Sequence, residues 1–101
     1  MAINTLHLRV LVLFLEDILR QKGITLTQAS KDANFNRLLY YNAKRIIAGK
    51  NAFKITVNLI FIIYLSNFFG VTFDMAAYLK IIAEQDRLKL LSEVPIDDLP
   101  T

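Results

Sequence analysis

The chain has 101 residues, of which 12 are basic and 9 acidic, and it contains no cysteine. This length fits one domain, and the lack of thiols excludes disulfides and cysteine-ligated metal sites. Hydrophobic residues make up 54% of the chain, which excludes disorder for most of it. This is more apolar surface than a lone small domain needs, so we expect the surplus to be covered by self-association, by a partner or by a membrane.

The net positive charge of the chain lies in its middle third. Residues 33–73 contain five of them and no acidic residue. Residues 74–101 contain six acidic residues and three basic ones. A polyanion would therefore be attracted to the middle third.

The first predicted helix runs from about Leu6 to Lys22, because apolar residues recur there at intervals of three and four. Gly23 is a suitable terminator. The apolar stretch 10–15 is short and is followed by acidic residues. We therefore expect no signal peptide and a cytoplasmic location.

A second, short helix is expected to begin near Thr25. Thr25 and Gln28 have the spacing of a capping box, in which each side chain satisfies the free backbone N–H of the other residue. Asn34 tolerates the left-handed conformation and predicts a tight turn. Phe35 would plug the core at that turn, and Asn36 can cap the following helix.

The third predicted helix spans about 37–48 and ends at Gly49. One flank carries the residues that we expect to face inward: Leu39, Tyr40, Ala43, Ile46 and Ile47. The other flank carries the residues that we expect to face solvent: Arg37, Tyr41, Asn42, Lys44 and Arg45.

The fourth predicted helix, over 59–69, is the most apolar part of the chain and ends at Gly70. Thr72 is expected to cap a fifth helix over about 73–79.

The segment 80–92 is expected to continue helical. Its apolar residues could pack on the body of the protein or on a second subunit: Ile81, Ile82, Leu88 and Leu91. Residues 93–101 are acidic and contain both prolines, which predicts a tail. The expected organisation is a domain over 1–92 followed by this tail.

Two segments carry a resemblance to a known family. Residues 23–36, with a capping threonine, small residues inside the short helix, a turn, an apolar plug and a polar cap, resemble the opening of the lambda-repressor-like (Cro/repressor, XRE-type) helix-turn-helix domains. Residues 69–74, Phe-Gly-Val-Thr-Phe-Asp, resemble the turn between helices four and five of that family. The resemblance covers about Leu8 to Leu79. The chain departs from the pattern at Leu26, where the family usually has glutamine, and in a lengthened third helix.

The resemblance implies an all-α, five-helix bundle with a helix-turn-helix, extended by a C-terminal helix. It also implies a sequence-specific DNA-binding regulator of transcription, such as a repressor of the bacterial, phage or plasmid type, with the helix at 37–48 in the major groove. Its base-reading positions would be Asn36, Arg37, Tyr41 and Asn42. The residues better suited to phosphates are Thr25, Thr27, Lys44, Arg45, Lys50 and Lys54.

Alternatives remain open beside this interpretation. The same fold could be a protein-interaction module, such as an antirepressor or a partner subunit, that does not bind DNA. The uncharged run 55–73 approaches the length of a membrane span. We expect no enzymatic activity, metal or cofactor, because the sequence lacks a cysteine, a second histidine and a glycine-rich phosphate loop. A homodimer is expected, through the first helix or through the fifth with its 80–92 extension.

Overall fold

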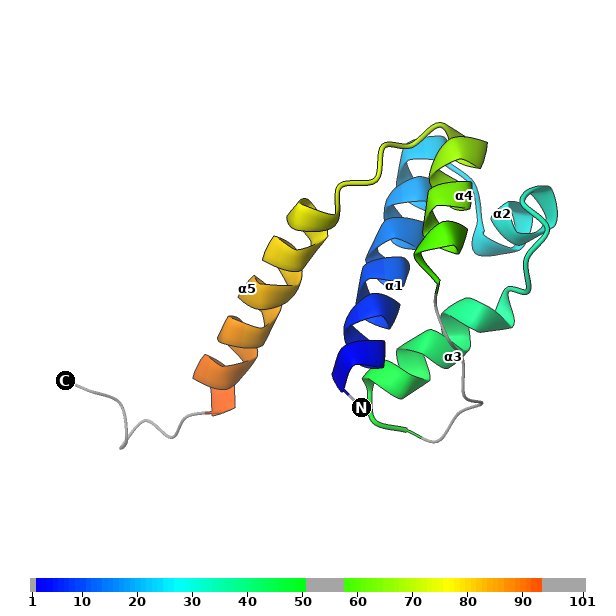
Figure 1. The fold of residues 1–101 in the computed structure, drawn as a ribbon. Helices are drawn as coiled ribbons and strands as arrows, with labels where there is room; N and C mark the ends of the chain where they lie inside the picture. Colours follow the sequence, from blue (N-terminus) through cyan, green and yellow to red (C-terminus); the bar gives the residue numbers. More distant parts are fainter. Residues whose placement is uncertain (1, 51–57, 94–101) are drawn as a thin grey trace.

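All the regular structure in the described part of the chain is helical, which confirms the predicted all-α class. The computed structural model describes residues 2–50 and 58–93. Its helices, shown in Figure 1, are α1 (Ala2–Lys22), α2 (Leu26–Asp32), α3 (Leu38–Ile47), α4 (Leu59–Phe69) and α5 (Met75–Glu93). The first helix begins four residues earlier than predicted, while its end at Lys22 agrees with the sequence.

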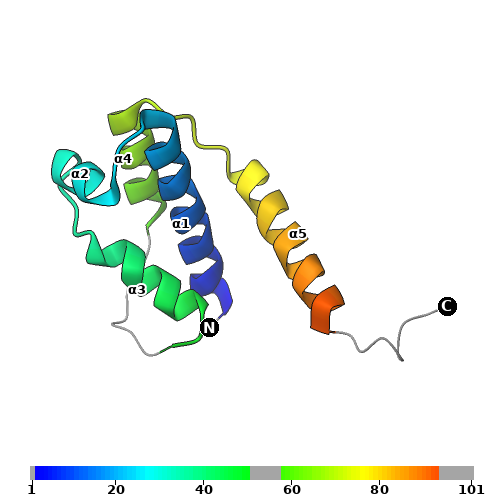
Figure 2. The same ribbon diagram turned by 180° about the vertical axis from the view of Figure 1, so that it is seen from behind.

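Helix α1 forms the centre of the bundle. Helices α3 and α4 lie beside it, and α5 runs antiparallel to it on the side away from α2 (Figures 1 and 2). Most of the buried side chains of α1 form one cluster with buried side chains from α2, α4, α5 and the turn after α4. The members of this cluster are Val10, Leu11, Phe14, Leu15, Ile18, Ala29, Ala33, Ile62, Leu65, Phe69, Val71, Tyr78 and Ile82.

The predicted capping box at the start of α2 is half right. Thr25 caps the helix, since its Oγ1 accepts a hydrogen bond from the backbone N–H of Gln28 at 3.1 Å. The reciprocal bond is absent, because the Gln28 side chain donates to Asp32 Oδ1 at 2.7 Å instead. Residues four positions apart on a helix are neighbours. The Gln28 side chain therefore turns toward Asp32 and does not reach back to the backbone N–H of Thr25.

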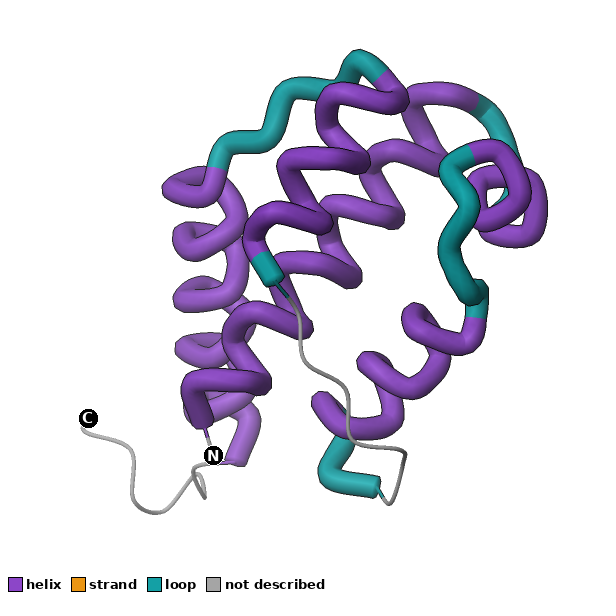
Figure 3. The backbone as a smooth tube through the Cα atoms, turned by 45° about the vertical axis from the view of Figure 1, so that its right-hand side comes forward, coloured by secondary structure: helices purple, strands orange, loops and turns teal. Residues whose placement is uncertain are grey.

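The turn between α2 and α3 (Figure 3) follows the prediction closely. Asn34 has a φ of 57°, in the left-handed region. Phe35 packs against the core, with its ring edge-on to Phe61 at a centroid distance of 5.8 Å. The Oδ1 of Asn36 accepts from the backbone N–H of Leu38 at 2.9 Å, so the side chain of Asn36 caps α3.

Helix α4 is an eleven-residue helix with a defined cap at each end. Asn58 Oδ1 accepts from the backbone N–H of Ile60 at 2.9 Å, and Gly70 ends the helix with a φ of 65°. The apolar run 55–73 is therefore interrupted by a turn. No helix within the described residues combines the length and apolarity that crossing a membrane requires.

Helix α5 starts later than predicted and with a different cap. Its first backbone groups are capped by Asp74, whose Oδ1 lies 3.3 Å from the backbone nitrogen of Ala77, so the predicted cap at Thr72 is wrong. Asp74 directly precedes the first residue of α5, and aspartate is at least as good a cap as threonine. The predicted helical continuation over 80–92 is confirmed, since α5 is one helix to Glu93. The part of the predicted tail beyond Glu93 lies outside the described residues.

Helix α5 is attached to α1 by both apolar and polar contacts. Tyr78 and Ile82 are buried, and the Tyr78 hydroxyl donates to Asp17 Oδ2 at 2.5 Å. One further turn along, Arg9 and Asp86 form an ion pair at 2.8 Å. Of the apolar residues predicted to pack, Ile82 does so on the body, while the side chains of Ile81, Leu88 and Leu91 are exposed.

Candidate nucleic-acid interface

Helix α3 is fixed to α1 by its inward flank. Ala43 is fully buried in a small cluster with Leu8 and Val12 of α1. Each of the five residues predicted to face inward (Leu39, Tyr40, Ala43, Ile46 and Ile47) is buried or partly buried against the core. A small alanine at the contact lets the two helices approach closely, so the orientation of α3 is set by α1.

A polar contact that the sequence did not reveal supports this attachment. The hydroxyl of Tyr40 donates to Glu16 Oε2 of α1 at 2.9 Å. Burial, the hydrogen bond to Glu16 and the charge of that carboxylate together raise the pKa of Tyr40 to about 12. The Nζ of Lys44 lies 5.5 Å from the centroid of the same ring, a cation–π distance. Tyr40 and Glu16 are 24 positions apart in the chain, so the sequence pattern gave no indication that they pair.

A second tyrosine holds the turn that precedes α3. The hydroxyl of Tyr64 in α4 donates to the backbone carbonyl of Ala33 at 2.6 Å. Because this carbonyl lies at the end of α2, the bond ties the helix-turn-helix segment to α4. The loop geometry is thus supported from outside as well as by its own caps.

The outward flank of α3 is polar and open to solvent. Of the four predicted base-reading residues, Asn36, Arg37 and Tyr41 are exposed. Asn42 is half-buried, so it is the least accessible of the four. The side chain of Tyr41 is 51% exposed, and its ring meets that of Tyr40 edge-on at 5.5 Å.

The residues predicted to contact phosphates divide between the ends of the two helices. Those that the structure describes are all exposed: Thr25, Thr27, Lys44, Arg45 and Lys50. The remaining one, Lys54, lies outside the described residues. Arg37 Nη1 is 3.5 Å from Thr27 Oγ1, a long contact that brings the start of α3 next to the start of α2.

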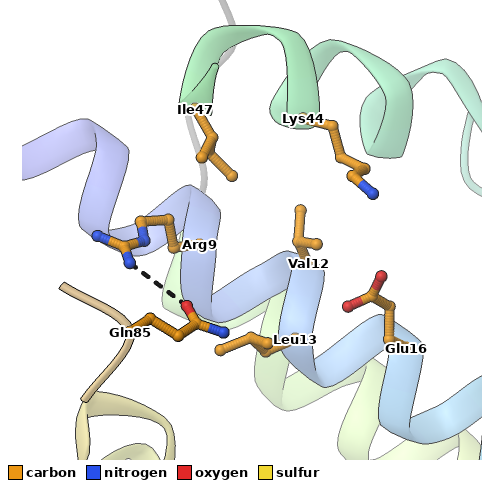
Figure 4. A pocket seen from close by; sticks show the side chains of 7 residues that line it. All are labelled: Arg9, Val12, Leu13, Glu16, Lys44, Ile47 and Gln85. Atoms are coloured by element: carbon orange, nitrogen blue, oxygen red, sulfur yellow. Dashed lines mark hydrogen bonds between the residues drawn. The ribbon is translucent and has the colours of Figure 1, made fainter. Parts of the chain in front are cut away.

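A small cavity lies behind α3, between α1, α3 and α5 (Figure 4). It has a volume of about 180 Å³ and is lined by Arg9, Val12, Leu13, Glu16, Lys44, Ile47 and Gln85. Arg9 donates across it to Gln85 Oε1 at 3.4 Å. Its polar groups therefore serve mainly the contacts between helices, and the outward flank of α3 remains the stronger candidate for a site. Within residues 2–50 and 58–93, no three metal-ligating side chains come together.

The chain was compared with family models, curated proteins and solved structures, and none of them matches it. The likeness to lambda-repressor-like domains therefore stays a prediction from the segments 23–36 and 69–74. What the structure adds is geometric: the two short helices, the turn between them and the exposed polar flank of the second.

Proposed function

We propose that this protein is a sequence-specific DNA-binding regulator of transcription that inserts α3 into the major groove. The observation that carries the proposal is the outward flank of α3, which is polar, cationic and exposed in the part of the chain that the structure describes. An α-helix fits the width of the major groove. In helix-turn-helix proteins the second helix of the motif takes that place.

The chemistry of this flank suits both parts of DNA recognition. Arg37 can bond a guanine bidentately, and Asn42 can pair with adenine. Asn36 can donate to a base through its Nδ2, because its Oδ1 accepts from the backbone N–H of Leu38. Lys44, Arg45 and Lys50 can meet phosphates, which position a protein without specifying the sequence.

The electrostatics favour a polyanion on the same flank. Neither Arg37 nor Lys44 is ion-paired with an acid among the residues that the structure describes. Glu16, which accepts from the hydroxyl of Tyr40, lines the same cavity as Lys44, so Arg37 is the cation of this pair that lies farther from an acidic group of α1 in the contacts described. No acidic residue occurs between positions 33 and 73, so this segment of the chain has a positive net charge that attracts phosphates.

Salt dependence of binding to mixed-sequence duplex DNA tests the proposal. Neutralising several phosphates releases counterions, so the affinity should fall steeply as salt rises, with a logarithmic slope of about −0.9 per phosphate contacted. Fluorescence anisotropy of a labelled duplex measures this. An absence of binding even at low salt would favour the alternative, a protein-interaction module on the same fold.

A matched pair of charge changes localises the contact. Lys44→Gln on α3 and Lys89→Gln on α5 remove the same charge from two exposed positions. We expect Lys44→Gln to reduce the salt slope by about 1 and to weaken binding evenly across sequences. Lys89→Gln should leave the slope unchanged. Equal effects of the two variants would place the DNA elsewhere on the molecule.

A further inference from the structure

One helix of the bundle presents an apolar face to solvent. We call it the α4 outer face and define it by Leu59, Ile60, Ile63, Tyr64 and Phe68. Their side chains are between 42% and 71% exposed, with Ile60 the most exposed. The opposite flank of α4 is also apolar, and its Ile62, Leu65 and Phe69 are buried in the core. A helix that is hydrophobic all round is normally buried all round.

The α4 outer face carries no charge. From Asn58 to Phe73 the chain has neither an acidic nor a basic residue, and the polar Asn67 is the exception on the exposed flank. Spacings of three and four along the helix place the five side chains side by side on one surface. The rings of Tyr64 and Phe68 are 5.9 Å apart. The five apolar side chains are thus neighbours on one surface, with Asn67 among them.

The area of this face is that of a major surface patch. A fully exposed aromatic side chain presents on the order of 200 Å²; taking the same value for leucine and isoleucine, the five side chains together expose roughly 500 Å² at their exposed fractions. The largest apolar patch on an ordinary monomer is about 300–600 Å² and is often functional. Two such faces brought together would bury up to about 1,000 Å², which is the threshold for a candidate interface and corresponds to a small one.

Helices α1 and α5, through which the sequence predicted a homodimer, have less suitable outer surfaces than α4. The apolar stripe of α1 is inside the bundle, with Leu8, Leu11, Leu15 and Ile18 fully buried. Helix α5 has exposed leucines, but charged residues are interleaved with them: Lys80, Glu84, Asp86, Arg87 and Lys89. The cores of interfaces are depleted in charged residues, which favours α4 over α5.

We propose that the α4 outer face is the contact between two copies of this chain, related by a two-fold axis that passes near Ile63. An uncharged face offers nothing that selects an acidic or a basic partner, whereas it is complementary to itself. The area also matches, because a two-fold contact uses the same patch twice. Tyr64 is held in advance by its bond to the Ala33 carbonyl, which lowers the entropy cost of ordering its ring at the contact.

Oligomeric state in the absence of DNA tests this proposal independently of the proposed function. In sedimentation velocity at micromolar and higher concentrations, the wild-type protein should have twice the 11.6 kDa mass of the chain. Ile60→Lys would bury an unpaired charge at the contact, and we expect it to raise the dimer dissociation constant about 100-fold or more. The matched control is Leu90→Lys on α5, which changes a residue of similar exposure, 65% against 71%. It should leave the mass unchanged.

Cross-linking supplies a readout that does not depend on a destabilising charge. The chain has no cysteine, so a single introduced thiol is unique. Ile63→Cys should give a covalent dimer with a short bis-maleimide, and Leu90→Cys should not. A monomeric wild type overturns the proposal, as does dissociation by Leu90→Lys in place of Ile60→Lys. Binding of a monomer to phosphatidylglycerol vesicles, lost in Ile60→Lys, would instead assign the face to a lipid surface.

Discussion

Helices α3 and α4 are nearly equal in length, ten and eleven residues, and each turns one flank to the core. Their outward flanks have opposite chemistry. That of α3 carries Arg37, Tyr41 and Arg45, while that of α4 carries isoleucine and aromatic side chains. Burial of the inward flank explains why both helices fold. It does not explain why the outward flank is polar in α3 and apolar in α4.

The difference shows where the surplus hydrophobicity of this chain resides. It is not in a larger core, because residues such as Ile60 and Phe68 are exposed in the single chain. The inward flanks determine the fold, and the outward flanks carry the two proposals made above: a polyanion partner for α3 and an apolar contact for α4. Changes on one flank at a time can separate the two roles.

The largest effect is expected on the inward side of α4. Leu65 is fully buried, so Leu65→Ala should lower the free energy of unfolding by about 2–5 kcal/mol through lost burial and a cavity. Ile63→Ala, on the outer face, should cost less than about 1 kcal/mol in the monomer. Urea denaturation, at concentrations low enough to avoid self-association, measures both. If both variants cost the same there, the outer face is not free in the single chain and the contrast with α3 fails.

A smaller effect is expected on the outward side of α3. Arg37→Ala should lower the affinity for the preferred DNA sequence by about 1–3 kcal/mol and relax the preference at one base pair, with little change in stability. Arg87→Ala on α5 removes the same charge from another exposed position and is the control. Competition between preferred and altered duplexes measures the discrimination. Unchanged discrimination in Arg37→Ala would remove this residue from the reading face.

The parts of the fold that could be predicted from the sequence depend on local chemistry. Asn34 adopts the left-handed turn, Asn36 caps α3 and Gly70 ends α4, because each effect lies within a few residues of the side chain that causes it. The two flanks of α3 were separable for the same reason, since the period of a helix assigns them. Asn42, which is half-buried, falls at the boundary between those flanks.

The parts that could not be predicted depend on contacts between distant positions. The hydroxyls of Tyr40 and Tyr78 bond to Glu16 and Asp17 of α1, across 24 and 61 residues. A tyrosine in an apolar pattern is equally consistent with core or surface until the facing helix is known. The sequence also gave no means to decide which apolar helix remains uncovered, because α1 and α4 are both apolar nearly all round.

The polar anchor of α3 gives the smallest expected effect and one with a distinct pH dependence. Tyr40→Phe should cost about 1 kcal/mol at neutral pH, because it removes one hydrogen bond to a carboxylate. In the folded protein the pKa of Tyr40 is raised from 10.0 to about 12. Below pH 10 the phenol is protonated in both states and contributes no slope. Between pH 10 and 12 the unfolded chain releases the proton while the folded chain retains it, so wild-type stability falls as pH rises.

The fall in the free energy of unfolding above pH 10 should be shallower in Tyr40→Phe. Part of the fall should remain, because burial also raises the pKa of Tyr78. Tyr41→Phe is the matched control, because that side chain is half exposed and lies next in the chain. Chemical denaturation at a series of alkaline pH values measures the three curves. If Tyr40→Phe and Tyr41→Phe follow the same curve, the bond to Glu16 does not hold α3 in solution. The orientation of α3 would then depend on Ala43 and its apolar neighbours alone, whereas α4 would still be tied to the end of α2 by the bond from Tyr64 to the Ala33 carbonyl.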